Sequence, residues 1–356
     1  RIFKMFKLSK SLNFNIKIFI TILTVLFFST ELTLKYVLKY NLTYTEENGS
    51  MLYISMYKSK SLEKIYTKYF LKQDDIQSLT RDPNSKDLMS NIEFSYLHQY
   101  NSIGLRDEEL IIDENNYSII GLGDSFTEGV GSPQDSTWLK LLEYNLNLFD
   151  STSTFKTING GVSSSDPFIE YFILSKKLIQ YKPDMVIVAI NKSDIDDVII
   201  RGGFERFDKS IMPFEGPWWE FFYSYSYIFR SIIHSFFDIN YSLLTEKRYK
   251  IEKEIAINKL SKCILEEYKT LANQNKFKLV IVLHPVQDEI EKRKFSLEGL
   301  DVIFSSDISF ATINLYKEYN EYFKENSKVV KDYYWQFDRH HNSKGCKLWA
   351  DILTSK

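Results

Sequence analysis

The chain contains 356 residues, 44% of them hydrophobic, which is enough to form the core of one large domain with an additional segment. Its 45 basic and 47 acidic residues leave a net charge of −2, which argues against a nucleic acid as a partner. The five histidines and two cysteines lack the spacing of metal ligands, so we expect no metal site. Cys263 and Cys346 are either two free thiols or one disulfide.

The amino-terminal segment is first basic and then apolar. Basic residues recur from Arg1 to Lys17, and no acidic residue occurs before Glu31. The positive-inside tendency therefore predicts a basic cytoplasmic tail at 1–17, a transmembrane signal anchor at 18–37 in contact with membrane lipid, and an extracytoplasmic remainder. The uncharged run is shorter than the roughly 20 residues of a typical span, so a cleaved signal peptide is the alternative.

Residues 38–110 are polar, tyrosine-rich and weakly patterned, which is typical of a membrane-proximal linker or accessory segment. Within them we expect short helices at 62–73 and 76–79. Arg106 is interpreted as a structural residue in a packed salt bridge, because binding of an anionic substrate group is the less common use of such an arginine.

Strands alternate with helices from residue 111 to residue 356, where we expect one catalytic domain. This order predicts a three-layer α/β/α sandwich with a central parallel sheet, of the flavodoxin-like kind, whose functional residues lie at the carboxyl ends of the strands. The expected strands are 117–122, 155–158, 185–190 and 278–283. The expected helices are 135–148, 167–181, 251–275, 309–325 and 343–353.

An aromatic-rich insertion at 196–250 interrupts this alternation, with Trp218 and Trp219 near its middle. Three interpretations remain open for it. It forms a helical cap on the core, an aromatic wall for a sugar or acyl substrate, or a segment that touches the lipid bilayer.

The run from Gly123 to Gly129 reads Gly-Asp-Ser-Phe-Thr-Glu-Gly and directly follows the first predicted strand. A serine at a strand-to-helix turn projects from the carboxyl edge of a sheet, and the first turn of the next helix offers free N–H groups to an oxyanion. Ser125 is therefore the candidate nucleophile. The alternative is that Ser125 serves only as a helix N-cap.

Asp338 and His341 lie three residues apart shortly before the terminal helix, and Asn342 and Gly345 follow them. This spacing lets a carboxylate orient an imidazole that takes the proton of the serine. We expect Asp338 as the acid and His341 as the base, with the neighbouring His340 as the alternative base. His284, which precedes a proline at the end of a predicted strand, is expected to be structural.

The two end blocks, Gly-Asp-Ser at Ser125 and Asp-x-x-His at His341, resemble those of the SGNH or GDSL hydrolase family over residues 111–356. In that family a glycine of the second block and an asparagine of the third complete the oxyanion hole beside the N–H of the serine. Here Ser164 stands at the glycine position. Asn191 or Ser193 supplies the third-block donor, and we favour Asn191 because an amide N–H₂ always donates.

The resemblance implies a membrane-anchored, extracytoplasmic serine esterase or O-acyltransferase without a metal or organic cofactor. An O-acetyl group on a cell-surface carbohydrate is the substrate that the resemblance favours, and lipid esters come next. We expect Asp124 and Asp194, the acidic residues of the first and third blocks, to contact the substrate. Because the two middle blocks match imperfectly, a non-catalytic protein that binds glycan or scaffolds the cell envelope is the alternative.

Overall fold

The computed structural model describes residues 2–34, 79–113, 115–207, 222, 226–229, 232, 246–326 and 329–356, and of residues 2–13, 200, 201, 206, 207, 325 and 326 only the backbone. The chain forms two compact units. One unit comprises residues 1–70 and 214–249, and the other comprises residues 71–213 and 250–356. The helix predicted at 62–73, nearly all of the helix predicted at 76–79 and much of the aromatic insertion lie outside the described residues.

A five-stranded parallel sheet forms the centre of the second unit, in the order β4-β3-β5-β6-β7. Its strands are β3 (Asn116–Leu122), β4 (Thr154–Asn159), β5 (Met185–Ile190), β6 (Lys278–Leu283) and β7 (Ala311–Asn314). The chain leaves β3 toward one neighbour, β4, and then crosses to the other neighbour, β5. The carboxyl ends of β3 and β5 therefore flank the topological switch point, where open parallel sheets form their sites.

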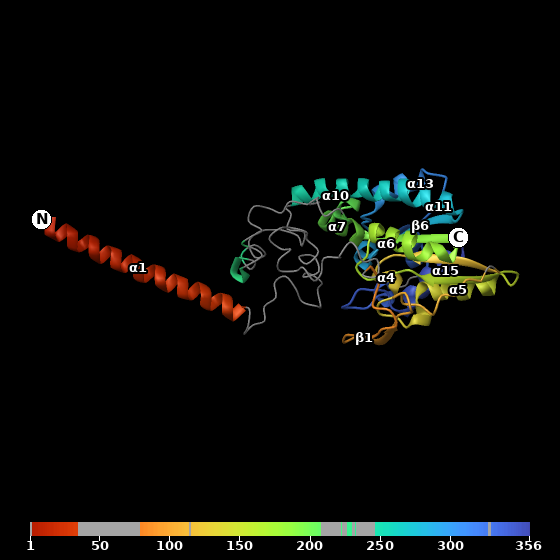
Figure 1. The fold of residues 1–356 in the computed structure, drawn as a ribbon, viewed down its shortest axis with the longest axis horizontal. Coiled ribbons are helices and arrows are strands. Elements are labelled where there is room, and N and C mark those ends of the chain that lie inside the picture. Colours follow the sequence, from red (N-terminus) through yellow and green to blue (C-terminus); the bar gives the residue numbers. More distant parts are fainter. Residues whose placement is uncertain are drawn as a thin grey trace. The chain divides into compact units, whose positions relative to one another are not determined.

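Helices cover both faces of this sheet (Figure 1). On one face α5 (Trp138–Phe149), α14 (Leu315–Asn326) and α15 (Ser343–Thr354) enclose a hydrophobic core that contains Trp138 and Trp349 with stacked rings. On the opposite face lie α6 (Pro167–Ile173), α10 (Glu246–Lys262), α11 (Lys269–Asn275) and α13 (Glu298–Ser305). Consecutive residues of the central strands are buried, because their side chains alternate between two faces that are both covered, as the apolar runs predicted. The three-layer α/β/α sandwich is therefore confirmed.

Several elements differ from those predicted. The helix expected at 309–325 begins only at Leu315, because residues 311–314 extend the sheet as its last strand. Also unpredicted are α7 (Lys192–Arg201), α12 (Gln287–Lys292), α13 and the antiparallel pair β1 (Lys86–Ser90) and β2 (Ser95–Gln99). The segment 79–110 belongs to the same compact unit as the sheet. Both cysteines are buried free thiols, which excludes a disulfide between them.

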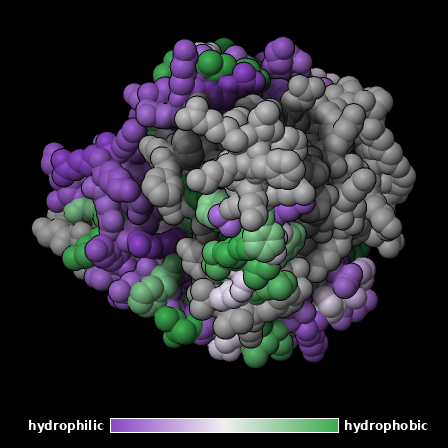
Figure 2. Space-filling model, turned by 90° about the vertical axis from the view of Figure 1, so that its left-hand side faces the viewer, coloured by the Kyte–Doolittle hydropathy of each residue, from purple (hydrophilic) through white to green (hydrophobic). Residues whose placement is uncertain are grey.

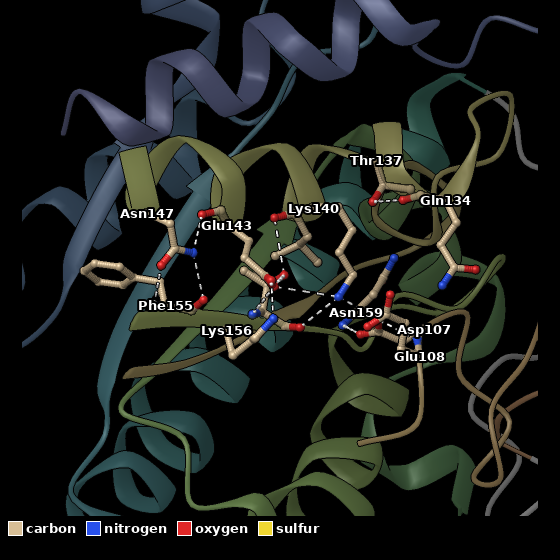
Figure 3. Close-up of polar contacts among 12 residues, drawn as sticks. Asp107, Glu108, Gln134, Thr137, Lys140, Glu143, Asn147, Phe155, Lys156 and Asn159 are labelled. Atoms are coloured by element: carbon tan, nitrogen blue, oxygen red, sulfur yellow. Dashed lines mark hydrogen bonds and ion pairs between the residues drawn. The ribbon is translucent and has the colours of Figure 1, made fainter. Parts of the chain in front are cut away.

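The backbone N–H and C=O groups on the outer edge of β4 form hydrogen bonds with side chains rather than with another strand (Figure 3). Asn147 accepts the N–H of Phe155 at 2.9 Å and donates to its carbonyl at 3.0 Å, while Glu143 accepts the N–H of Thr157 at 2.8 Å. Two further contacts join Lys140 to the carbonyl of Thr157 and Asp107 to the N–H of Asn159. An edge strand whose outward groups are occupied in this way does not pair with another chain.

The first unit contains α1 (Ile2–Leu32), whose segment Phe14–Leu32 is long and apolar enough to cross a membrane. Its mean hydropathy is 1.6 and none of it is buried, and Figure 2 shows hydrophobic surface, in green, gathered over this helix. Thr21 and Thr24 donate their hydroxyls to backbone carbonyls one turn earlier, so each polar hydroxyl has a partner within this apolar helix. A signal sequence near the N-terminus has the same length and composition.

At the carboxyl end of α1, Glu31 holds a short piece of the aromatic insertion. Its carboxylate accepts the N–H of Tyr227 at 2.8 Å, the N–H of Ile228 at 3.2 Å and the hydroxyl of Ser226. Part of the insertion is therefore bound to the apolar helix within this unit.

Candidate active site

Ser125 lies at the carboxyl end of β3, on a turn that its neighbours fix. Asp124 caps the single-turn helix α4 (Ser125–Glu128) by accepting the N–H of Phe126 at 2.9 Å. Gly129 ends this helix in the left-handed region, at a φ of 88°, which a glycine adopts without strain. Ser125 itself occupies the first helical position, where its N–H has no acceptor within the helix. The predicted strand-to-helix turn is therefore present, and Asp124 rather than Ser125 is the N-cap.

A continuous hydrogen-bond chain joins Ser125 to Asp338 through His340. The Nε2 atom of His340 lies 2.7 Å from the Oγ atom of Ser125, and its Nδ1 atom lies 2.6 Å from Oδ1 of Asp338. A carboxylate only accepts, so Nδ1 carries the proton and Nε2 is left to accept from the serine. This is the arrangement of a nucleophile, a base and an orienting acid.

The expectation that His341 contacts Ser125 is wrong. His341 is 2% exposed, and in the described part of the chain neither of its ring nitrogens has a hydrogen-bond partner. Its ring lies among aromatic side chains, with centroids 4.5 Å from that of Tyr334 and 5.3 Å from that of Phe126. Burial holds the pKa of His341 well below its usual value, so the ring is a neutral core side chain.

Backbone pairing explains why His340, and not His341, contacts Ser125. Residues 340–342 run antiparallel to residues 333–335, with His341 and Tyr334 forming a β-bridge and Trp335 donating to the carbonyl of His340 at 2.9 Å. Successive side chains in such a pairing face opposite sides, so His340 faces Ser125 while His341 enters the core. Arg339 adopts a φ of 72°, which turns the chain and brings His340 back to Asp338 two residues earlier.

The hairpin β1–β2 supports the loop that carries the acid. The carboxylate of Glu93 accepts three successive backbone N–H groups, from residues 336, 337 and 338, at 2.7 to 2.9 Å. Asn91 donates to Oδ2 of Asp338 at 3.3 Å. These two residues lie far from Asp338 in the sequence, in the segment that we interpreted as a linker. They are the functional residues that sequence reasoning missed, since no local pattern marked them.

The pKa of Asp338 is set by opposing effects. Burial raises it, but the hydrogen bond and charge of His340, together with the backbone of His340 and the amide of Asn91, outweigh burial, and the net pKa lies below its usual value. Asp338 is therefore ionised at neutral pH. An ionised carboxylate beside Nδ1 stabilises the imidazolium that forms when the serine loses its proton.

Glu128 joins the nucleophile helix to the loop after β4. Its buried carboxylate accepts the N–H of Ser163 at 2.5 Å and the hydroxyls of Ser163 and Tyr100. A Cβ on Gly161 in this loop would lie 2.2 Å from the N atom of Glu128, so only a glycine permits the approach. The loop therefore packs directly against α4.

Ser164 follows in this loop with a φ of 64°, in the left-handed region. This explains why a glycine is usual at its place in the family that the sequence resembles, since glycine adopts this conformation at the lowest cost. The backbone of Ser164 thus takes the geometry expected at that position although it bears a side chain.

Asn191 is buried beside the nucleophile turn. Its Nδ2 atom donates to Oδ2 of Asp124 at 2.8 Å, and its Oδ1 atom accepts the N–H of Ser193 at 2.7 Å as the N-cap of α7. The hydroxyl of Ser193 lies 2.5 Å from Oδ1 of Asn191 and 3.2 Å from Oδ2 of Asp124, so its one proton is used within this cluster. The amide nitrogen of Asn191 has a second proton that the contact with Asp124 does not use.

The acidic residues of the first and third blocks have structural contacts. Asp194 is 1% exposed and accepts the N–H of Asn191 at 2.7 Å, so the expectation that it binds substrate is wrong. Both carboxylate oxygens of Asp124 are already occupied by protein donors. Burial raises the pKa of Asp194 and of its neighbour Glu170 well above their usual values, and nearby carboxylates raise both further.

The two other predicted structural residues are buried. Arg106 is 1% exposed and donates to the backbone carbonyls of Glu128, Gly129 and Ser132, so it supports the nucleophile turn through carbonyls rather than through the expected salt bridge. His284 is fully buried against Trp349 and Phe126, and burial lowers its pKa to about 4. Within the described residues no group of histidine, cysteine, aspartate and glutamate side chains is arranged to hold a metal ion.

No protein-family model and no curated protein matches the chain. Among solved structures it is similar to a two-domain esterase active on acetylated mannans, with 12% identity and a TM-score of 0.43 over 67% of this chain and 48% of that one, about half its length. It is also similar to an acetyl xylan esterase, with 17% identity and a TM-score of 0.41 over 67% of this chain and 98% of that one. An acetylxylan esterase from Geobacillus stearothermophilus gives 12% identity and a TM-score of 0.41, over 68% and 96% of the two chains. At these values the fold assignment depends on the strands and helices described above.

Proposed function

We propose that the protein is a serine-dependent ester hydrolase with Ser125 as nucleophile, His340 as base and Asp338 as orienting acid. The observation that carries the proposal is the hydrogen-bond chain between these three residues, with both of its contacts at 2.7 Å or less. Ser125 is only partly buried, so a substrate carbonyl has access to its hydroxyl.

In the proposed reaction, His340 Nε2 takes the proton of Ser125 while Oγ attacks the ester carbonyl. The same nitrogen then returns the proton to the leaving alcohol, and an acyl group remains on the serine. Water, activated by His340, releases the acyl group. Asp338 stays ionised and keeps the imidazole in the tautomer that this sequence of steps needs.

The oxyanion of each tetrahedral intermediate requires donors fixed in advance. We assign them to the N–H groups of Ser125 and Ser164 and to the amide of Asn191. The contact of Asn191 with Asp124 supports this assignment, because it orients the amide beside the nucleophile turn. Asp124 and Asn191 thus act together as a fixed unit.

For location and substrate we propose a single-pass membrane protein with the sheet domain outside the cytoplasm, acting on O-acetylated cell-surface carbohydrate. The apolar α1 and its basic flank support the anchor. The substrate class follows from the family that the sequence resembles. Transfer of the acyl group to another alcohol uses the same acyl-enzyme, and a lipid ester is the next substrate.

The test is labelling of the full-length protein in detergent with a fluorophosphonate probe, together with hydrolysis of a small aryl acetate. We expect labelling of wild type, loss of labelling in Ser125→Ala, and slow turnover of the ester. Labelling that persists in Ser125→Ala would identify another nucleophile. A folded wild-type protein that is not labelled would support the alternative, a glycan-binding or scaffold protein of the envelope.

A further inference from the structure

Ser165 joins the loop after β4 to the nucleophile turn. It directly follows Ser164, whose N–H is a proposed oxyanion donor, and its hydroxyl lies 3.0 Å from the carbonyl of Gly123, two residues before the nucleophile. The N–H of Val162 donates to the same carbonyl at 3.0 Å. Ser165 is 2% exposed, so water does not compete for these contacts. A displacement of Ser165 would therefore move the N–H of Ser164 relative to Ser125.

The hydroxyl of Ser165 has a second polar neighbour, the side chain of Glu170 on α6. Oε1 of Glu170 lies 2.8 Å from Oγ of Ser165. Glu170 is fully buried, and in the described part of the chain its other oxygen, Oε2, has no hydrogen-bond partner. Ser165 thus lies between two oxygens, one on the carbonyl of Gly123 and one on Glu170.

The number of available protons decides the direction of both contacts. A hydroxyl has one proton, and the carbonyl of Gly123 can only accept. An ionised Glu170 could also only accept, so one of the two contacts of Ser165 would bring lone pairs together. A protonated Glu170 removes this conflict, because its O–H donates to Ser165 while Ser165 donates to Gly123. The neutral acid also avoids a buried charge on a group with an unpartnered oxygen.

The surroundings of Glu170 favour the same state. Burial raises the pKa of Glu170 well above its usual value, the hydrogen bond with Ser165 lowers it, and the charges of neighbouring carboxylates raise it further. These carboxylates come from the start of α6, from the nucleophile turn and from α7, and they are Asp166, Asp124 and Asp197. An ionised Glu170 would in turn raise the pKa of Asp194 and of Tyr268. Because like charges disfavour ionisation, these neighbours favour a neutral Glu170.

We propose that Glu170 is a positioning residue that, as a neutral acid, donates to Ser165 and so holds the carbonyl of Gly123. The proposal rests on the proposed function, in which the adjacent Ser164 supplies an oxyanion donor. The contact orients the loop after β4 against the nucleophile turn before substrate arrives. Because an oxyanion donor acts in the transition state, loss of this contact lowers kcat more than it changes KM.

The chain offers a matched control in Glu128, a second buried glutamate that contacts a serine of the same loop. Its carboxylate accepts three donors, the N–H and hydroxyl of Ser163 and the hydroxyl of Tyr100. An amide at position 128 keeps only one acceptor oxygen for these donors, whereas an amide at position 170 supplies an N–H that Ser165 accepts. The same change, glutamate to glutamine, is therefore expected to be costly at 128 and tolerated at 170.

The first experiment needs no catalysis. Melting temperatures of full-length wild type, Glu170→Gln and Glu128→Gln are measured in detergent at pH 5 and pH 8. A folded-state pKa of Glu170 above the unfolded value of about 4.3 makes wild type lose stability as pH rises between the two values, and Glu170→Gln has no such loss. We expect Glu170→Gln to gain stability relative to wild type from pH 5 to pH 8, and Glu128→Gln to be less stable than wild type at both. A difference between Glu170→Gln and wild type that does not grow with pH overturns the proposal.

The second experiment measures the hydrolysis of an aryl acetate. Glu170→Ala is expected to lower kcat by about tenfold with little change in KM, and Glu170→Gln to keep most of the wild-type kcat, since its amide donates in place of the acid. Ser165→Ala removes the middle of the chain of contacts and should match Glu170→Ala, and the double variant should be no worse than either. Equal losses in the Gln and Ala variants at matched melting temperature, or additive losses in the double variant, contradict a role through Ser165.

The two experiments separate a failure of this proposal from a failure of the proposed function. A folded wild-type protein without labelling by the fluorophosphonate probe or esterase activity would contradict the hydrolase, and the pH dependence of the melting temperature would still decide the state of Glu170. An active wild type with an unchanged kcat in Glu170→Ala would support the hydrolase and overturn the positioning role.

Discussion

The nucleophile loop, residues 123–129, and the acid–base loop, residues 336–342, meet at one hydrogen bond but are held in different ways. The first continues a central strand and is fixed by neighbours in the sheet, with Asp124 capping its helix and contacting Asn191 at the end of the adjacent strand. The second lies beyond the sheet. Its acid is fixed by the hairpin β1–β2, 243 to 245 residues earlier in the sequence.

This difference shows which loop a single substitution displaces more easily. A loop that extends a buried strand is held in place by the close packing around that strand. A loop clamped by one carboxylate, Glu93, depends on three hydrogen bonds that a single substitution removes. We therefore expect changes near Ser125 to affect chemistry and folding together, and changes at the hairpin to affect mainly the position of the acid.

The largest expected effect separates the two adjacent histidines. His340→Ala removes the base, and we expect kcat for an aryl acetate to fall by about 10⁴-fold or more, because the serine loses its proton acceptor. His341→Phe keeps an aromatic ring in the core, and the melting temperature of each variant is recorded beside its kcat. A large loss of kcat in a stably folded His341→Phe with little loss in His340→Ala would restore the order first read from the sequence.

The next effect concerns the oxyanion donor. Asn191→Ala is expected to lower kcat by about 10²–10³-fold, as loss of one such donor does elsewhere. Ser193→Ala should cost much less, because its hydroxyl proton is used within the Asn191–Asp124 cluster. Steady-state kinetics on both variants decides between them. A greater kcat loss in Ser193→Ala, at matched melting temperature, would reverse the assignment.

The bracing of the acid–base loop is tested by Glu93→Ala. Loss of the clamp on residues 336–338 displaces Asp338 and His340, and we expect kcat/KM to fall by about 10- to 100-fold, since small misplacements are costly in catalysis. The matched control is Glu143→Ala, which also removes a carboxylate from a backbone N–H but lies at the edge of β4 (Figure 3). Both variants should lose stability, and only Glu93→Ala should lose activity. Equal kcat/KM in the two would mean that the hairpin does not position the acid.

The sequence predicted Ser125 and Asp338, but not which of the two adjacent histidines lies between them or what holds the acid–base loop. Ser125 follows an apolar strand and precedes a helix, and such local patterns are visible in the chain. The choice between His340 and His341 depends on the pairing of residues 340–342 with 333–335, which decides the direction of each side chain. Glu93 and Asn91 act through tertiary contacts, which leave no periodicity or spacing in the sequence.

The same distinction applies to the fold. The parallel sheet could be predicted for two reasons. Strands alternate with helices along the chain, and strands buried on both faces appear as continuous apolar runs. The helix expected at 309–325 was wrong at its start, since residues 311–314 pair with β6 and tertiary pairing overrides local preference. The hairpin β1–β2 was missed because its residues are mostly exposed and polar, so no apolar alternation marked it.

The smallest expected effect is on the pH dependence of stability. It tests whether His341 is a buried, neutral side chain of the core. Its folded-state pKa lies well below the unfolded value of 6.5, because burial disfavours the charged ring. The unfolded chain therefore binds a proton more readily, and the folded state loses stability as pH falls below 6.5.

His341→Phe removes this loss. Urea unfolding of wild type and variant at pH 7 and pH 5 measures it as a difference. The buried acids Glu170 and Asp194, whose raised pKa values act in the opposite direction, are the same in both proteins and cancel. We expect the unfolding free energy of wild type to fall more between pH 7 and pH 5 than that of the variant, because only wild type carries the buried imidazole. Identical falls would mean that His341 is already protonated, or reached by water, in the folded protein. Its place in the aromatic core behind the triad would then need revision.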